Sequence, residues 1–196
     1  MVALHIDSVT MAYGRRLLFE AVSVHLSDGE ILTVTGQNGS GKSTFLKIIA
    51  GLARPESGTV RRVGFDALGY AAPDVQLYAE LTGNENLDFF ARLRGVPLGQ
   101  GPTLLPQVGL PAARGLDRVG EYSSGMRQRL KLAVSLLGDP PLLLWDEPTA
   151  TLDEAGKQCV DELLTAHRRR GGLAVVATND TGEAARWGTQ RLRIGV

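Results

Sequence analysis

A glycine-rich segment near the N-terminus constrains this sequence more than any other feature. It stands between a β-rich run, Glu30 to Thr35, and a run with helical apolar spacing, Lys42 to Ala50. The segment reads Gly36-Gln37-Asn38-Gly39-Ser40-Gly41-Lys42-Ser43-Thr44. Its pattern, G-x-x-x-x-G-K-S, is typical of a loop whose inward-pointing N–H groups surround phosphate oxygens, because glycine permits the backbone curl. The sequence therefore predicts a phosphate-binding loop, and the positive N-terminus of the following helix adds to the attraction.

Two side chains at the end of this loop predict further parts of the ligand. Lys42 is placed to reach the β- and γ-phosphates of a nucleotide, and the Ser43 hydroxyl is placed to ligate Mg²⁺. We therefore expect a nucleoside triphosphate with its magnesium ion.

A second candidate site follows an apolar run later in the sequence. Leu142 to Trp145 reads as a buried strand, and two carboxylates, Asp146 and Glu147, come directly after it. We expect Asp146 to hold Mg²⁺ through water. Glu147 is one residue further along and points elsewhere, so it is the candidate base that polarises the attacking water.

The order of elements predicts an α/β fold. Strand-like runs alternate with helical runs at both ends of the chain, which indicates a largely parallel sheet covered on both faces. The middle, about residues 76–139, is helical and irregular and interrupts this pattern as an inserted lobe. Thr82 to Glu85 matches a capping box at the start of its first helix. We expect one domain over residues 1–196, with the final strand, Arg191 to Ile194, at a sheet edge.

Composition excludes several classes of protein. Lys plus Arg and Asp plus Glu number 21 each, so the chain lacks the basic excess of a dedicated nucleic-acid binder. No apolar run approaches the roughly 20 residues that span a bilayer, and the N-terminus lacks the features of a signal peptide. We expect a cytoplasmic protein that reaches a membrane only through a partner.

One further segment is more specific than the phosphate loop. It reads Tyr122-Ser123-Ser124-Gly125-Met126-Arg127-Gln128-Arg129 and opens a predicted helix. It resembles the signature of the ABC ATPase family, usually Leu-Ser-Gly-Gly-Gln, and the resemblance extends over the whole chain. Ser123 and Gly125 match the family form, whereas Tyr122, Ser124 and Met126 depart from it.

The resemblance implies a fold and a two-subunit site. It implies a P-loop NTPase core with an antiparallel β subdomain and an inserted α-helical lobe. Two subunits, either two copies or two homologous ATPase subunits, hold ATP between them. Ser123, Ser124 and Gly125 of one subunit then cap the nucleotide on the phosphate loop of the other. Tyr13 matches the aromatic residue that stacks on adenine, and Asp153 is expected at the dimer seam.

Two positions depart from the family pattern. Pro73 stands where the family has a glutamine that senses Mg²⁺ and the attacking water and links the catalytic core to the helical lobe. Asp74 and Gln76 are the candidates to substitute for it, and the alternative is that neither touches the metal. We favour Asp74, because a carboxylate accepts from a magnesium-bound water. Asn179 stands where the family has a histidine that contacts the γ-phosphate. Its amide donates a hydrogen bond but carries no positive charge, so we expect ATP hydrolysis that works but is slower.

Three functions compete at this point. The first is the ATPase subunit of a membrane transporter that binds a separate transmembrane permease on the inner face of the cell membrane. Leu87, Phe89 and Phe90 are candidates for that contact, with core packing as the alternative. The signature form and the short chain resemble small exporter ATPases, including the heme-exporter ATPase of cytochrome c maturation. The second function is a non-transport ATPase acting on DNA or ribosomes, and the third is a degenerate regulatory nucleotide binder.

Overall fold

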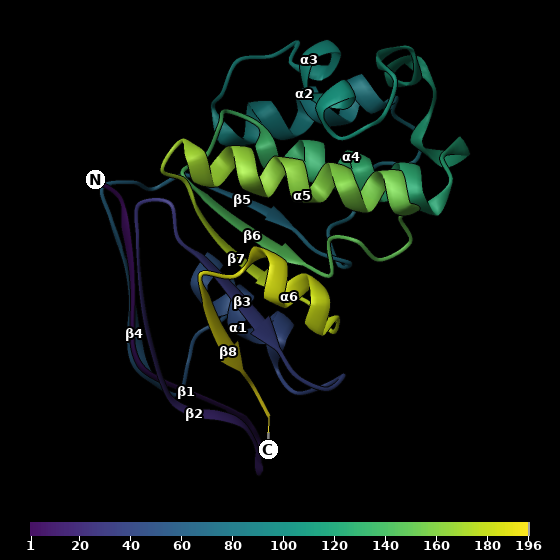
Figure 1. The fold of residues 1–196 in the computed structure, drawn as a ribbon. Coiled ribbons are helices and arrows are strands. Elements are labelled where there is room, and N and C mark those ends of the chain that lie inside the picture. The colour runs from purple at the N-terminus through teal and green to yellow at the C-terminus, as the bar shows by residue number, and fades with distance from the viewer. Residues whose placement is uncertain (196) are drawn as a thin grey trace.

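The computed structural model describes residues 1–195 and contains two sheets and a helical lobe (Figure 1). The strands are β1 (Ala3–Tyr13), β2 (Arg16–Ser27), β3 (Ile31–Thr35), β4 (Ser57–Val63), β5 (Leu68–Ala71), β6 (Leu142–Asp146), β7 (Leu173–Ala177) and β8 (Gln190–Arg193). The α-helices are α1 (Lys42–Ala50), α2 (Gly83–Arg94), α3 (Gly101–Gln107), α4 (Ser124–Leu136), α5 (Glu154–Arg169) and α6 (Thr181–Trp187). Two 3₁₀ turns, Ala112–Leu116 and Val119–Glu121, lie between α3 and α4.

The larger sheet is parallel and has the strand order β5-β6-β7-β3-β8. All residues of β6 and β7 are buried, as expected for parallel strands covered on both faces. Alternate residues enter two cores: Leu142 and Leu144 pack on the α1 side, whereas Leu143 and Trp145 pack on the side of α4 and α5. The final strand, β8, lies at the edge of the sheet as predicted.

The smaller sheet is antiparallel, in the order β2-β1-β4. Its strand β1 is irregular near Ser8. Leu4 and Ile6 are buried, and then the register shifts near Ser8, so Val9 and Met11 are buried instead. Ser8 has a φ of 49°, and this irregularity changes the parity of inward-facing residues in a strand that continues to Tyr13.

The chain between β5 and β6 is helical and forms the predicted lobe, at the top of Figure 1. The predicted capping box is present: Thr82 Oγ1 accepts from Glu85 N at 3.2 Å, and Glu85 Oε2 accepts from Thr82 N at 2.7 Å. Helix α4 joins the lobe to the sheet. Trp145 of β6 donates to Ser135 Oγ at 2.9 Å, and Ser135 Oγ donates to Leu132 O at 2.6 Å.

These observations confirm the predicted fold class, with its parallel core, antiparallel sheet and inserted lobe.

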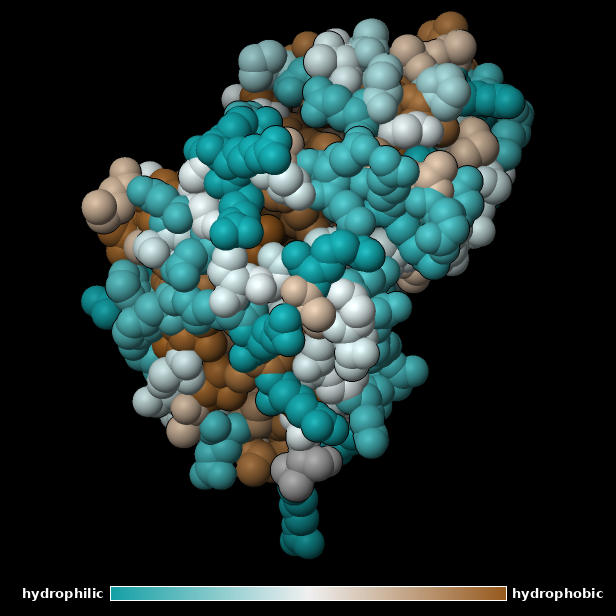
Figure 2. Space-filling view, in the orientation of Figure 1, coloured by the Kyte–Doolittle hydropathy of each residue, from teal (hydrophilic) through white to brown (hydrophobic). Residues whose placement is uncertain are grey.

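Hydrophilic side chains cover α5 on the face shown in Figure 2. Among residues 1–195, none of the helices has both the length and the apolar character needed to cross a bilayer.

Candidate functional site

The glycine-rich loop joins β3 to α1, as predicted. Helix α1 begins after Gly41, which has a φ of 106° and provides no side-chain cap, so the first N–H groups of the helix are available to an anion. Ser40 N donates to Gln37 O at 3.1 Å and fixes the curl of the loop. Gly36 admits no side chain, because a Cβ there would overlap the carbonyl oxygen of Ile194.

Lys42 lies inside the loop and donates to three oxygens. Its Nζ is 2.9 Å from Gly36 O, 3.3 Å from Gln37 O and 2.7 Å from Asn179 Oδ1. Because a lysine ammonium only donates, the oxygen of the Asn179 amide has to face it. Asn179 Nδ2 therefore faces the loop and donates to Asn38 Oδ1 at 2.8 Å. The structure thus brings the predicted Asn179 onto the phosphate loop through a contact with Asn38 that the sequence did not reveal.

The two acids lie beside this loop. Asp146 is the last residue of β6 and is 3% exposed, and its pKa is raised because burial outweighs the Ser43 hydrogen bond and the Lys42 charge. Glu147 has a φ of 49°, which turns it away from the strand direction. Burial also raises the Glu147 pKa, and its Oε1 atom is buried without a hydrogen-bond partner among the described residues. Such an atom marks a place where a ligand or water belongs.

Ser43 and Asp146 fit a magnesium ion chemically, since both offer oxygen, the ligand atom that Mg²⁺ prefers. Asp74, the third candidate, is placed differently. Its carboxylate pairs with Lys47 at 2.7 Å and is absent from the residues that line the pocket beside Lys42. Its charge still contributes to the raised pKa of Asp146, so it lies near this acid. Gln76 lines a separate groove.

A pocket of about 520 Å³ joins these groups. It is lined by Tyr13, Arg16, Leu18, Asn38, Gly39, Gly41, Lys42, Ser43, Thr44, Pro73, Asp146, Glu147 and Asn179. Tyr13 ends β1 and is 58% exposed, so its ring is available for stacking.

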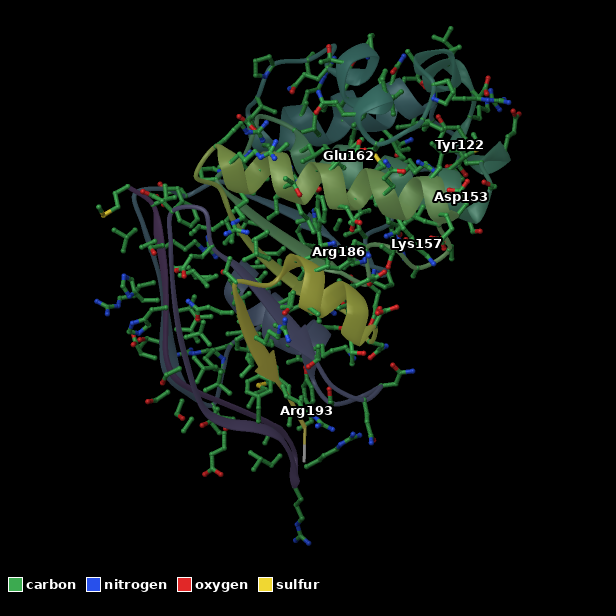
Figure 3. The ribbon with its side chains drawn as sticks, viewed as in Figure 1. Tyr122, Asp153, Lys157, Glu162, Arg186 and Arg193 are labelled. Atoms are coloured by element: carbon green, nitrogen blue, oxygen red, sulfur yellow. The ribbon has the colours of Figure 1, made fainter. Side chains whose placement is uncertain are left out.

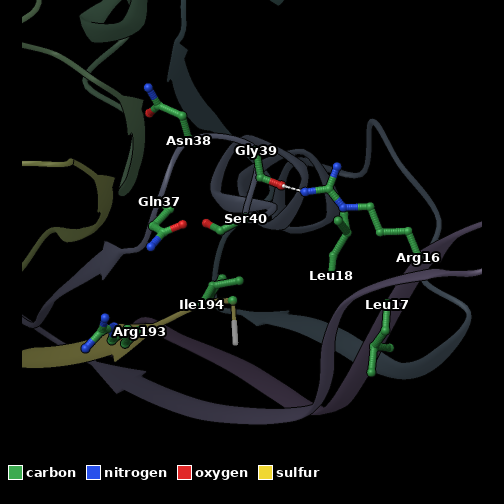
Figure 4. Close-up of a pocket in the computed structure, with 10 residues that line it drawn as sticks. Arg16, Leu17, Leu18, Gln37, Asn38, Gly39, Ser40, Arg193 and Ile194 are labelled. Carbon is green, nitrogen blue, oxygen red and sulfur yellow. Dashed lines mark hydrogen bonds between the residues drawn. The ribbon is translucent and has the colours of Figure 1, made fainter.

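Gln37 and Ser40, which were also predicted to bind the nucleotide, line a different cavity (Figure 4). This cavity of about 250 Å³ adjoins the first, with which it shares Arg16, Leu18, Asn38 and Gly39, and Arg193 and Ile194 also line it. Arg16 supports the loop from there by donating to Gly39 O at 2.9 Å.

The signature segment lies at the N-terminus of α4, as predicted. Ser123 is the N-cap residue, and its Oγ accepts from Met126 N at 3.2 Å. Tyr122, which departs from the family form, is buried and donates to Arg114 O, so it anchors the segment in the lobe. Ser123, Ser124 and Gly125 are absent from the lining of the Lys42 pocket. Within one chain the signature therefore contributes nothing to that pocket.

Asp153 lies at the same end of the molecule as Tyr122, as Figure 3 shows. It caps α5 by accepting from Gly156 N at 2.9 Å, and it accepts from Arg129 of α4 at 2.7 Å. The ion pair with Arg129 links the start of α5 to the signature helix.

The apolar candidates for a partner contact on the lobe, Leu87, Phe89 and Phe90, divide into two groups. Leu87 is fully buried and belongs to the core, so the packing alternative is correct for this residue. Phe89 and Phe90 are half-buried and stack edge-on at 5.4 Å between ring centroids, and Phe90 also packs against the core. Tyr78 packs on Phe89 at 4.6 Å and is 45% exposed, which completes an aromatic cluster at the surface.

Comparisons with known proteins agree with this arrangement. The family model described as ABC transporter matches residues 19–150. Nod factor export ATP-binding protein I of Paraburkholderia xenovorans is 34% identical over 94% of this chain and 65% of its own length. Cytochrome c biogenesis ATP-binding export protein CcmA of Rhizobium johnstonii is 37% identical over 85% of this chain and 83% of its own length. An uncharacterized ABC transporter ATP-binding protein of Bacillus subtilis, YdbJ, is 36% identical, and the match spans 61% of its length.

Solved structures of ABC transporter cassettes have a similar fold. The dimeric ABC transporter cassette MJ0796 superposes with a TM-score of 0.87 at 26% identity, covering 98% of this chain and 94% of that one. A dimeric post-hydrolysis state of MJ0796 bound to ADP and Pi superposes with a TM-score of 0.86, also at 26% identity.

Proposed function

Because this chain belongs to the ABC transporter family, as its signature segment predicted, we propose that it binds and hydrolyses ATP to drive a membrane transporter. The observation that carries this proposal is the pocket that gathers Lys42, Ser43, Asp146 and Glu147 from two segments far apart in the chain. These four groups supply phosphate binding, a magnesium ligand set and a base.

In this proposal, ATP binds with its phosphates on the N–H groups at the start of α1 and its adenine on Tyr13. Lys42 turns from the carbonyls of Gly36 and Gln37 to the β- and γ-phosphates. The exchange replaces neutral acceptors by charged ones, and hydrogen bonds between two ions are the stronger kind. Ser43 and Asp146 are the residues that would hold Mg²⁺, which would supply neutralisation of the charge that develops on the phosphate oxygens.

Glu147 acts as the base for the attacking water. Its unpartnered Oε1 is free to accept a hydrogen bond from this water, and its raised pKa makes it a better proton acceptor than an exposed glutamate. Asn179 acts on the γ-phosphate. Its Nδ2 has two hydrogens, of which Asn38 takes one, so the second is available for a phosphate oxygen.

A second subunit completes the site. The signature lies outside the pocket of its own chain, so Ser123 and Gly125 reach a nucleotide only across a dimer. Dimeric MJ0796 provides a precedent for such an assembly. Either a second copy of this chain or a homologous subunit supplies the signature, and ATP stabilises the dimer until it is hydrolysed.

A separate permease is the third component. The cluster of Tyr78, Phe89 and Phe90 is a partly exposed aromatic surface on the lobe, and we assign to it the contact with the transmembrane subunit. The export function named for the Nod factor and CcmA relatives favours an exporter, with the chain peripheral on the cytoplasmic side of the membrane.

Phosphate release with MgATP tests the proposal. The purified protein should release phosphate, whereas Glu147→Gln should bind ATP, release almost none and elute as an ATP-dependent dimer. Full activity in Glu147→Gln would reject Glu147 as the base. Absence of phosphate release from the parent protein, with ATP still bound, would instead support a regulatory nucleotide binder.

A further inference from the structure

Lys131 is a charged side chain that the site described above does not use. It lies in the middle of α4, five residues beyond Met126, and is half-buried. Its ammonium donates to Pro73 O at 2.7 Å and to Ala72 O at 3.2 Å, and both acceptors are far away in the sequence. The signature helix therefore holds the segment that follows β5 directly by its backbone.

This contact is more than incidental packing. Burial lowers the pKa of the Lys131 ammonium, which means that the charge is partly removed from water. A partly buried charge is costly unless it is hydrogen-bonded, and two carbonyl acceptors offset that cost here. Ala72 is itself 1% exposed, and its carbonyl accepts from Val75 N at 3.1 Å in addition to Lys131 Nζ.

The segment held by Lys131 connects two cavities. Pro73 lines the nucleotide pocket with Lys42 and Glu147. Pro73 also lines a groove of about 600 Å³ between the lobe and the core, together with Gln76, Gln128 and Lys131. The two hydrogen bonds of Lys131 therefore join α4 to the wall of the nucleotide pocket.

We propose that Lys131 is a positioning residue that ties the signature helix to the Pro73 segment and so performs the linkage for which the family employs a glutamine side chain at position 73. Proline has no polar side chain with which to make that linkage. Its backbone carbonyl remains, and a lysine on the opposite element reaches it. The inference rests on the proposed ATPase function.

Lys131→Met tests the inference, because it removes the ammonium and keeps most of the aliphatic stem. We expect kcat for ATP hydrolysis to fall about tenfold, the effect of losing one charged hydrogen bond, while the Kd of the monomer for MgATP changes by less than about twofold. In a Glu147→Gln background, more ATP should be required to form the dimer. Lys131→Arg keeps a donor and should retain most of the activity.

Arg94→Met is the matched control. Arg94 also donates from a cationic side chain to a carbonyl of α4, Val134 O at 2.8 Å, but it lies in the lobe away from both cavities. This variant should lower thermal stability without the selective loss of kcat. An equal loss of kcat in Arg94→Met and Lys131→Met at equal loss of Tm would reduce Lys131 to a structural role and overturn the inference.

A double-mutant cycle with Pro73→Gln provides the decisive measurement. If Lys131 replaces the glutamine, Pro73→Gln should raise kcat more in the Lys131→Met protein than in the parent. Equal effects in the two backgrounds, or a Lys131→Met protein with parental kcat, would contradict the inference. A parent protein that fails to hydrolyse ATP would refute the proposed function before any variant is compared.

Discussion

The N-termini of α1 and α4 are the two helix ends assigned to phosphate, and they are built in opposite ways. Helix α1 begins at Gly41, without a side-chain cap, and its first N–H groups are open to a ligand. Helix α4 begins at Ser123, whose Oγ accepts from Met126 N within the same helix. Lys42, Asn179 and Asn38 surround the first end with hydrogen bonds, whereas the second end lies outside the pocket.

In the proposed two-subunit site, this difference would let one chain provide both halves. The uncapped end needs an anion and is suited to bind nucleotide alone. The capped end is stable without a ligand, yet the Ser123 hydroxyl still has its proton to donate, because it serves only as an acceptor in the cap. Nucleotide binding should therefore depend on the α1 end, and dimer formation on the α4 end.

Lys42→Met should have the largest effect and should act at the α1 end alone. It removes the charged donor to the phosphates, so we expect MgATP affinity to fall about a hundredfold, since each hydrogen bond to a charged group contributes about 1.5–3 kcal/mol. Titration with a fluorescent ATP analogue measures this. Lys157→Met, which removes an exposed lysine paired with Glu154, is the control and should bind like the parent.

Substitutions of Ser123 separate its cap from its phosphate contact. Ser123→Asp keeps an N-cap acceptor, so Tm should hold, but it has no hydroxyl proton and repels phosphate, so dimer formation in a Glu147→Gln background should be lost. Ser123→Ala should cost about 1 kcal/mol of stability from the cap, or about 2–4 °C in Tm. Size-exclusion chromatography with ATP and a thermal melt distinguish the two. A Ser123→Asp protein that still dimerises with ATP would show that the α4 end does not contact phosphate.

Asn179 variants should have smaller effects, because a neutral hydrogen bond is at stake. Asn179→Ala should lower kcat by about three- to tenfold, and Asn179→His should raise it, since a protonated imidazole supplies a charged donor. Steady-state phosphate release checks both. Parental activity in Asn179→Ala would show that this amide does not act on the γ-phosphate.

Glu147→Gln should change the stability of the folded chain only slightly, and it should raise stability where most substitutions lower it. Replacing the half-buried carboxylate should raise Tm at neutral pH by about 2–4 °C, or about 1 kcal/mol, because an ionised group is poorly satisfied there. The pKa of Glu147 in the folded protein lies above its ordinary value of 4.5. The gain should therefore be complete above the folded-state pKa, shrink as the pH falls through it, and vanish below the ordinary value.

Thermal melts of both proteins across this pH range measure the effect. An equal or lower Tm in Glu147→Gln at neutral pH would mean that water satisfies the carboxylate in solution.

Features that depend on residues close together in the chain could be predicted from the sequence. The phosphate loop, the capping box at Thr82 and the signature helix are set by residues close together in the chain, so pattern and spacing were sufficient. The bulge near Ser8 in β1 lies beyond such patterns, because it changes which alternate residues of the strand face inward.

Contacts between distant segments were also beyond the reach of sequence patterns. Asn179 with Asn38 and Lys131 with Pro73 are joined only after the sheet and the lobe have assembled. The burial of Leu87 could not be separated from surface exposure for the same reason, since α2 has apolar residues on more than one side.

The hydrogen bond between Trp145 and Ser135 gives this protein an intrinsic optical probe. The chain has two tryptophans, and Trp145 is a fully buried indole next to Asp146, bonded to the signature helix. A Trp187→Phe protein would therefore emit from this indole alone. The emission maximum and the quenching of Trp145 would report, in real time and without a label, whether β6 and α4 stay packed together as nucleotide binds and is hydrolysed.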